Sequence, residues 1–541
     1  MTNIRGVAVA NNIRDPFVLG GVGVTRPDVA GLHGLEVLER EPLASRIASL
    51  VHTHFDGLPS RSKPTVRPDG TKEWIPMSGV VVVKGENTPA EKLTCVAVTS
   101  GAKCLSASQV PNCKGLVLHD WHAEILALRA FNYWLLSECR SILTQKRQHS
   151  SSSSDGSQES PFSPSSPYLR CRQQYPPFEL QPDLTIYMYC TCAPCGDASM
   201  ELCMAAQEDP TPWEANPDNP DESKLSLLDG RAHFSRLGIV RRKPARADAE
   251  STLSKSCSDK LALRQISSLL SYETSLLVAP TETAYLAGVI LPENEVSSVG
   301  CARAFSDKGR MKVLKGRFWP LHNNSHSSPI PDQESSGYRF RPFRVLSIPM
   351  QKYASLWRYA KTGSSGTDAQ EKRKPAVISA VWTVAPSGPP PSVVENGVKS
   401  LPVLRRSKTG LYETLINGVK QGNRVSTPLA RGASALSRAK LWDTWREIVR
   451  LSCSGTDGEG NGLQGRHPAA LSIPEPVVDA ASYREFKKIL PVVAQGMVAQ
   501  GVVARKRAIQ EAKDVLDGWI SNARDEDWGL EVLVDPKKRK R

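Results

Sequence analysis

Three short segments, far apart along the chain, carry side chains that together can form one metal site. They are His122-Ala123-Glu124, Pro194-Cys195-Gly196 and Ser256-Cys257-Ser258-Asp259-Lys260. One histidine and two cysteines would hold a tetrahedral Zn²⁺ and leave its fourth position open for water. Zinc lowers the pKa of such a water toward neutrality and so supplies a nucleophile. A chain built around this site must fold so that the three segments converge.

Glu124 follows His122 by two residues, which puts its carboxylate beside the water rather than on the metal. A carboxylate in that position can take a proton from the water and pass it to a leaving amine. This combination of ligands and acid/base is typical of nucleobase deaminases. The residues therefore favour hydrolytic deamination, with Glu124 as the catalytic group.

The second cysteine ligand is not fixed by spacing alone. The general signature of zinc deaminases has two cysteines separated by two residues, but the position three after Cys195 is Ala198. The second thiolate must therefore come from elsewhere. The candidates are Cys190, Cys192, Cys203 and Cys257.

The segments around the predicted ligands read as helices and a strand. Ile125 to Leu136 is apolar on most sides and lacks Gly and Pro, so we expect a buried helix with the first metal-site segment in its first turn. Leu184 to Tyr189 is a strand by composition, and Asp197 to Ala206 looks helical. Cys195 would then precede a helix N-terminus, which favours thiolate over thiol.

Other stretches extend the alternation of strands and helices. A helix is expected from Pro42, strands at Trp74–Val83, Leu93–Val98 and Val377–Val384, a strand and a helix within Ser267–Leu291, and helices across Tyr483–Trp528 with a break at Pro491. This alternation predicts one α/β domain rather than separate modules.

Composition suggests where the domain begins and where loops interrupt it. We predict a disordered extension over residues 1–40, one domain over 41–530 and a basic tail over 531–541. Ser-, Pro- and Gly-rich stretches predict flexible insertions near 148–168, 321–338, 361–375 and 453–466.

Charge and cysteine usage point to a nucleic-acid partner inside the cell. The formal net charge of the 541 residues is +14, which favours a polyanion such as nucleic acid. The 12 cysteines do not resemble a disulfide framework, and no apolar run approaches the ~20 residues that span a bilayer. The run Pro536–Arg541 resembles a nuclear localisation signal. We expect a nuclear or cytoplasmic protein with no membrane association, and no protein partner is evident.

The chain resembles the adenosine deaminases that act on RNA. The resemblance lies in Gly101–Cys104, Leu118–Glu124, Pro194–Ala198, Ser256–Lys260 and Ser379–Val384, and in scattered form it covers roughly residues 40 to 530. It implies that Cys257 is the third zinc ligand. It also implies a cytidine-deaminase-like mixed sheet with flanking helices, enlarged by C-terminal helices and loop insertions.

Within that family the chain is most similar to the tRNA-specific branch. The matching segments are Gly238–Asp248, Leu58-Pro59, Lys63-Pro64 and Glu73-Trp74. We expect no double-stranded-RNA-binding domains of the kind that duplex editors carry, because the stretch before these segments is short. The implied reaction is adenosine to inosine in tRNA, at position 37 next to the anticodon of alanine tRNA. Two alternatives are editing of double-stranded or messenger RNA, and a non-catalytic zinc-containing RNA-binding protein.

The resemblance also implies an inositol hexakisphosphate enclosed in the fold. The residues that match the family's contacts by type and spacing are Asp120, Arg129, Lys260, Lys440, Tyr483, Lys487, Lys513 and Trp528. Two differences from the family pattern predict a remodelled cavity. Leu128 stands where the family often has Arg, and Leu263-Arg264 stands where it has Arg-Trp.

A basic cluster lies between the second and third metal-site segments. It comprises Arg236, Arg241, Arg242, Lys243 and Arg246. Cations on a loop beside the metal can grip an RNA backbone, which supplies affinity and orientation but not sequence specificity. We expect these residues to contact tRNA.

Overall fold

The computed structural model describes most of the predicted domain. The described residues are 41–152, 166–206, 228–229, 236–243, 250, 252–321, 336–361, 373–388, 408–453, 475–493, 497–519 and 525–534. Those from Pro42 onward belong to one compact unit. The predicted extension, the basic run Pro536–Arg541 and most of each predicted insertion lie outside the described residues.

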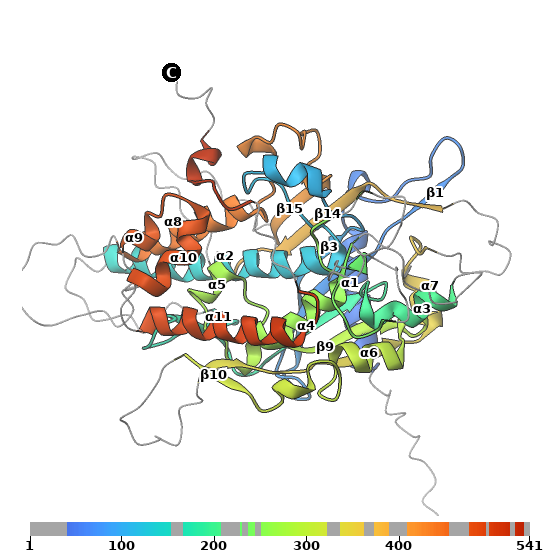
Figure 1. Cartoon of the computed structure of the whole chain (residues 1–541), viewed down its shortest axis with the longest axis horizontal. Coiled ribbons are helices and arrows are strands. Elements are labelled where there is room, and N and C mark those ends of the chain that lie inside the picture. The colour runs from blue at the N-terminus through green and yellow to red at the C-terminus, as the bar shows by residue number, and fades with distance from the viewer. Residues whose placement is uncertain are drawn as a thin grey trace, which may run out of the picture. The chain divides into compact units, whose positions relative to one another are not determined.

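An eight-stranded mixed sheet forms the centre of the described part (Figure 1). Its order is β12 (Arg344–Ile348), β9 (Leu286–Pro292), β6 (Leu184–Cys190), β2 (Met77–Lys84), β3 (Lys92–Ser100), β14 (Ile378–Val384), β15 (Thr409–Ile416) and β16 (Val419–Lys420). Strands β6, β9 and β12 are parallel to one another. The other neighbouring pairs are antiparallel.

Helices cover the sheet on both faces. This double burial explains why the sequence of β2 is almost continuously apolar. Val80 and Val82 belong to the cluster that contains α2 (Ala123–Ser152). Val81 and Val83 belong to the cluster that contains α1 (Leu43–Asp56). A strand buried on both faces needs apolar residues at every position.

The C-terminal helices pack around α2 and the helix that carries Cys257. Helix α8 (Arg438–Cys453) contacts α2, while α11 (Met497–Val515) contacts both α10 (Tyr483–Val493) and α4 (Cys257–Ser267). These helices therefore pack against α2 and α4, the two helices at whose starts the predicted ligands His122 and Cys257 lie.

The structure confirms the mixed sheet with flanking helices. The predicted helix from Pro42 is α1, and the predicted strands at Leu93–Val98 and Leu184–Tyr189 are β3 and β6. The single strand expected over Trp74–Val83 is two, because β1 (Lys72–Trp74) ends before Pro76 and β2 begins at Met77.

The expected helix break at Pro491 is wrong, since α10 continues through it to Val493. Proline lacks the N–H that would bond the carbonyl four residues earlier. That carbonyl, of Lys487, accepts a hydrogen bond from Lys506 Nζ instead, at 3.0 Å. A donor from α11 thus replaces the missing backbone donor.

Candidate metal centre and anion cavity

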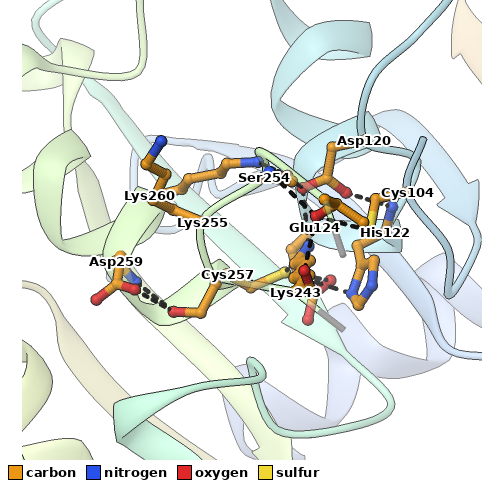
Figure 2. Close-up of polar contacts among 12 residues, drawn as sticks. Cys104, Asp120, His122, Glu124, Lys243, Ser254, Lys255, Cys257, Asp259 and Lys260 are labelled. Carbon is orange, nitrogen blue, oxygen red and sulfur yellow. Dashed lines mark hydrogen bonds and ion pairs between the residues drawn. The ribbon is translucent and has the colours of Figure 1, made fainter. Parts of the chain in front are cut away.

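The three predicted metal ligands lie at or just before helices and converge on one point, and Figure 2 labels two of them, His122 and Cys257. His122 immediately precedes α2, and Cys257 is the first residue of α4. Cys195 lies between β6 and the short helix η3 (Asp197–Ser199). Candidate ligand atoms of the three residues all lie within 4.8 Å of one another.

The donor set fits a zinc ion with an acid/base beside it. His122 Nδ1 lies 3.9 Å from Cys195 Sγ and 3.6 Å from Cys257 Sγ. The buried Glu124 carboxylate is adjacent, with Oε2 3.5 Å from Cys257 Sγ. One imidazole and two thiols match a three-ligand catalytic zinc site.

Proton sharing between the two cysteines also fits a cation at this point. The Cys257 thiol donates toward Cys195, and together with Lys243 and His122 this contact holds the pKa of Cys195 well below its usual value. Burial and the neighbouring sulfur raise the pKa of Cys257. Two buried thiolates repel each other, so both can ionise only when a cation lies between them.

Glycine at position 196 allows the two cysteine segments to approach closely. Its φ is +101°, and a Cβ built there would lie 2.2 Å from Ser256 Oγ. The segments are also joined by hydrogen bonds, because Ser258 N donates to Cys195 O at 3.0 Å and Ala198 N donates to Ser258 Oγ at 3.1 Å. Any larger residue at position 196 must push these segments apart.

Asp120 connects the metal centre to a neighbouring cavity. Its Oδ1 accepts from the backbone N–H of His122 at 3.0 Å, and its Oδ2 accepts from Lys243 Nζ at 2.8 Å and Lys260 Nζ at 2.5 Å. Lys243 Nζ also lies 3.3 Å from Cys257 Sγ. Burial alone would raise the pKa of Asp120, but the two ammonium groups hold it well below its usual value.

Lys260 borders a cavity of about 640 Å³ with a large excess of positive charge. The predicted residues Asp120, Arg129, Lys260, Tyr483, Lys487 and Lys513 line it. Lys255, Arg264, Arg438 and Arg505 also line it and were not singled out as ligands from the sequence. Asp120, Glu273 and Glu526 are the acidic residues among its described lining.

Crowding of cations in this cavity disfavours their charged forms. Burial, then the nearby Lys260 and Lys513, lowers the pKa of Lys255 to about 8. Burial, then the nearby Arg505 and Arg129, lowers the pKa of Arg264 to about 9. A bound polyanion would reverse these shifts, since an opposite charge favours the charged form.

Two residues expected at the cavity do not line it. Lys440, in α8, is not among the residues that line the cavity. Trp528 stacks on Tyr483 at a centroid distance of 4.8 Å. Trp528 therefore supports a lining residue, and the prediction that it contacts the anion directly does not match this geometry.

The basic cluster divides into buried and accessible members. Lys243 and Arg241 are only 3% and 1% exposed, so their expected contact with RNA does not match the structure. Lys243 instead pairs with Asp120, and the backbone N–H of Arg241 donates to Asp259. Arg236 is exposed and Arg242 half-buried, whereas Arg246 lies outside the described residues.

Comparison with known proteins identifies relatives over much of the chain. Residues 97–402 match the family model of the adenosine-deaminase (editase) domain. The relatives include proteins named tRNA-specific adenosine deaminase 1. The one from Schizosaccharomyces pombe is 36% identical over 303 residues, 56% of this chain and 66% of the relative. That from Saccharomyces cerevisiae is 32% identical over 253 residues, 46% of this chain and 58% of the relative.

A third relative of the same name, from Drosophila melanogaster, matches over a longer stretch. It is 30% identical over 425 residues, 76% of this chain and 84% of the relative. The match to the two yeast proteins therefore spans somewhat less than two thirds of their length, whereas the match to the fly protein spans most of it.

We predict that Gly196→Ala lowers zinc content, because its Cβ would force the segments of Cys195 and Cys257 apart. The matched control is Gly422→Ala. Gly422 also has a positive φ, +85°, but no atom lies within 4 Å of its built Cβ. Metal analysis of both folded proteins checks this. Equal zinc content in the two variants would contradict the role assigned to Gly196.

Proposed function

Since this chain belongs to the adenosine-deaminase (editase) domain family, we propose that it deaminates adenosine to inosine in tRNA. The observation that carries the proposal is the buried Glu124 carboxylate beside the cluster of His122, Cys195 and Cys257. A purely structural zinc site does not need a carboxylate at an open coordination position. The names of the relatives support tRNA as the substrate.

In this proposal His122, Cys195 and Cys257 hold zinc, in a cytidine-deaminase-like fold. When bound, zinc lowers the pKa of water and supplies a nucleophile at neutral pH. Glu124 accepts a proton from the attacking water and returns it to the amine that leaves C6 of adenosine. Burial raises the pKa of Glu124, which favours the step in which the protonated carboxyl holds that proton.

The proposed target is position 37 of alanine tRNA, next to the anticodon, as the sequence resemblance implies. An anticodon loop presents unpaired bases, so a base can enter a deep site at low unstacking cost. Arg236, Arg242 and Arg246 remain the proposed backbone contacts from the basic cluster. Arg236 is the member whose exposure best supports such a role.

The charged cavity supports a second proposal, that the fold encloses inositol hexakisphosphate. Cations converge there from α2, α4, α8, α10 and α11. Arg129, Lys260, Lys487 and Lys513 are proposed ligands, together with Arg505. Through Lys260 and Asp120 the bound anion would be connected by hydrogen bonds to the backbone of His122.

The proposed cellular location is the nucleus, on the strength of the basic run Pro536–Arg541, which lies outside the described residues. Among the described helices, none combines the length and apolar character needed to cross a bilayer.

We predict that Glu124→Gln strongly slows inosine formation while zinc is retained, because the amide cannot accept the proton. The rate should fall by about 100- to 10,000-fold. Inosine is measured by sequencing alanine tRNA and a long RNA duplex after incubation with purified protein. Editing of the duplex alone would contradict the proposal that tRNA is the substrate. Unchanged activity of Glu124→Gln would overturn the mechanism.

We predict that inositol hexakisphosphate copurifies and that Arg505→Met loses most of it. A charge-assisted hydrogen bond contributes about 1.5–3 kcal/mol, so affinity should fall roughly 10- to 100-fold. The matched control is Arg507→Met, because Arg507 is exposed on the same helix and does not line the cavity. Native mass spectrometry measures the bound mass. If the mass of the wild-type protein corresponded to the chain and zinc alone, the proposal would be contradicted.

A further inference from the structure

A second basic hollow lies on the molecule, separate from the anion cavity. It has a volume of about 650 Å³ and is formed by α6 (Ser298–Phe305), the turn after it, η6 (Lys312–Leu314) and Val515 at the end of α11. Arg303, Lys308, Arg310 and Lys312 line it. No acidic side chain of the described residues does so.

Two of these cations are available to a partner. Lys308 and Lys312 are exposed, and neither forms an ion pair with any other described residue. The acidic residue nearest in sequence, Asp307, pairs with Lys315 at 2.6 Å and not with Lys308. An exposed Val313 lies beside Lys312. The rim of the hollow therefore offers two exposed ammonium groups that form no ion pair among the described residues.

The floor of the hollow is held rigidly by the other two cations. Arg303 donates to Asp197 Oδ1 at 3.0 Å and to Glu201 Oε1 at 2.5 Å. The Arg310 side chain is only 5% exposed and donates to Asp259 Oδ1 at 2.6 Å. Its Nε and Nη2 have no hydrogen-bond partner among the described residues.

These arginines connect the hollow to both cysteine segments of the metal centre. Asp197 follows Cys195 by two residues, and Asp259 follows Cys257 by two residues. The segment that carries the exposed Arg236 lies beside the hollow, because the backbone N–H of Gly238 and Nε of Arg303 both donate to Asp197 Oδ1, at 2.8 and 3.0 Å. A chain of phosphates at Arg236 would thus have an adjacent basic surface to follow.

We propose that this hollow binds the phosphodiester backbone of the RNA substrate, with Lys308 and Lys312 as the direct contacts. The inference rests on the proposed action on tRNA and adds a docking surface to it. Phosphate contacts contribute affinity for a nucleic acid without reading its sequence, so the hollow strengthens RNA binding. Its effect should appear in binding rather than in the chemical step.

The test is the double variant Lys308→Ala/Lys312→Ala, measured for tRNA affinity over a range of salt concentrations. The charge-matched control is Lys92→Ala/Lys488→Ala, because both lysines are exposed on other elements and form no ion pair among the described residues. We expect the Kd for tRNA to rise about tenfold and the plot of log Kd against log salt to become shallower by about 0.7–0.9 per lysine. The control should change neither, and kcat at saturating tRNA should be unchanged in both variants.

Equal affinities and salt slopes for the two double variants would overturn the docking surface. A fall in kcat with unchanged affinity would also overturn it, since the loss would then lie in the chemical step. Failure of the wild-type protein to form inosine would refute the proposed function alone. In that case the binding measurement still decides whether the hollow binds tRNA.

Discussion

The buried carboxylate of Asp120 is the interaction on which the rest of the site depends. It accepts hydrogen bonds from the backbone of His122, from Lys243 and Lys260, and from Ser254 Oγ at 2.7 Å. An isolated buried carboxylate is costly, and so is an isolated buried ammonium. Their mutual pairing therefore fixes the start of α2, the third metal-site segment and the edge of the anion cavity relative to one another.

Arginine–aspartate pairs likewise hold the two cysteine segments in place. Arg303 and Arg310 hold Asp197 and Asp259, the residues that follow the two cysteines. Gly196 lets the cysteine segments touch, and Arg310 lies within 4.0 Å of both Asp197 and Asp259, so it links the two segments. Positive charge thus serves two purposes in this chain. Buried cations support the predicted metal ligands, and exposed ones in the turn after α6 and on η6 are available to an anionic partner.

Local sequence could predict many of the elements and the convergence of His122, Glu124 and Cys195, because each of these segments carries its own pattern. Cys257 could be chosen only through the family resemblance, because spacing left four cysteines as candidates. It could not predict which cations are buried. Lys243 lies in a run that reads as a solvated basic loop, and only the packed fold pairs it with Asp120. Arg438 and Arg505 reach the anion cavity from helices distant in sequence, so no motif marks them.

The central claim is that His122, Cys195 and Cys257 hold a catalytic zinc ion with one position left for water. X-ray absorption at the zinc edge of the purified protein tests it most directly. The account predicts two sulfur ligands at about 2.3 Å and two nitrogen or oxygen ligands at about 2.0–2.2 Å. A site with three or four sulfur ligands would contradict it, because a further cysteine would then occupy the position that the reaction requires.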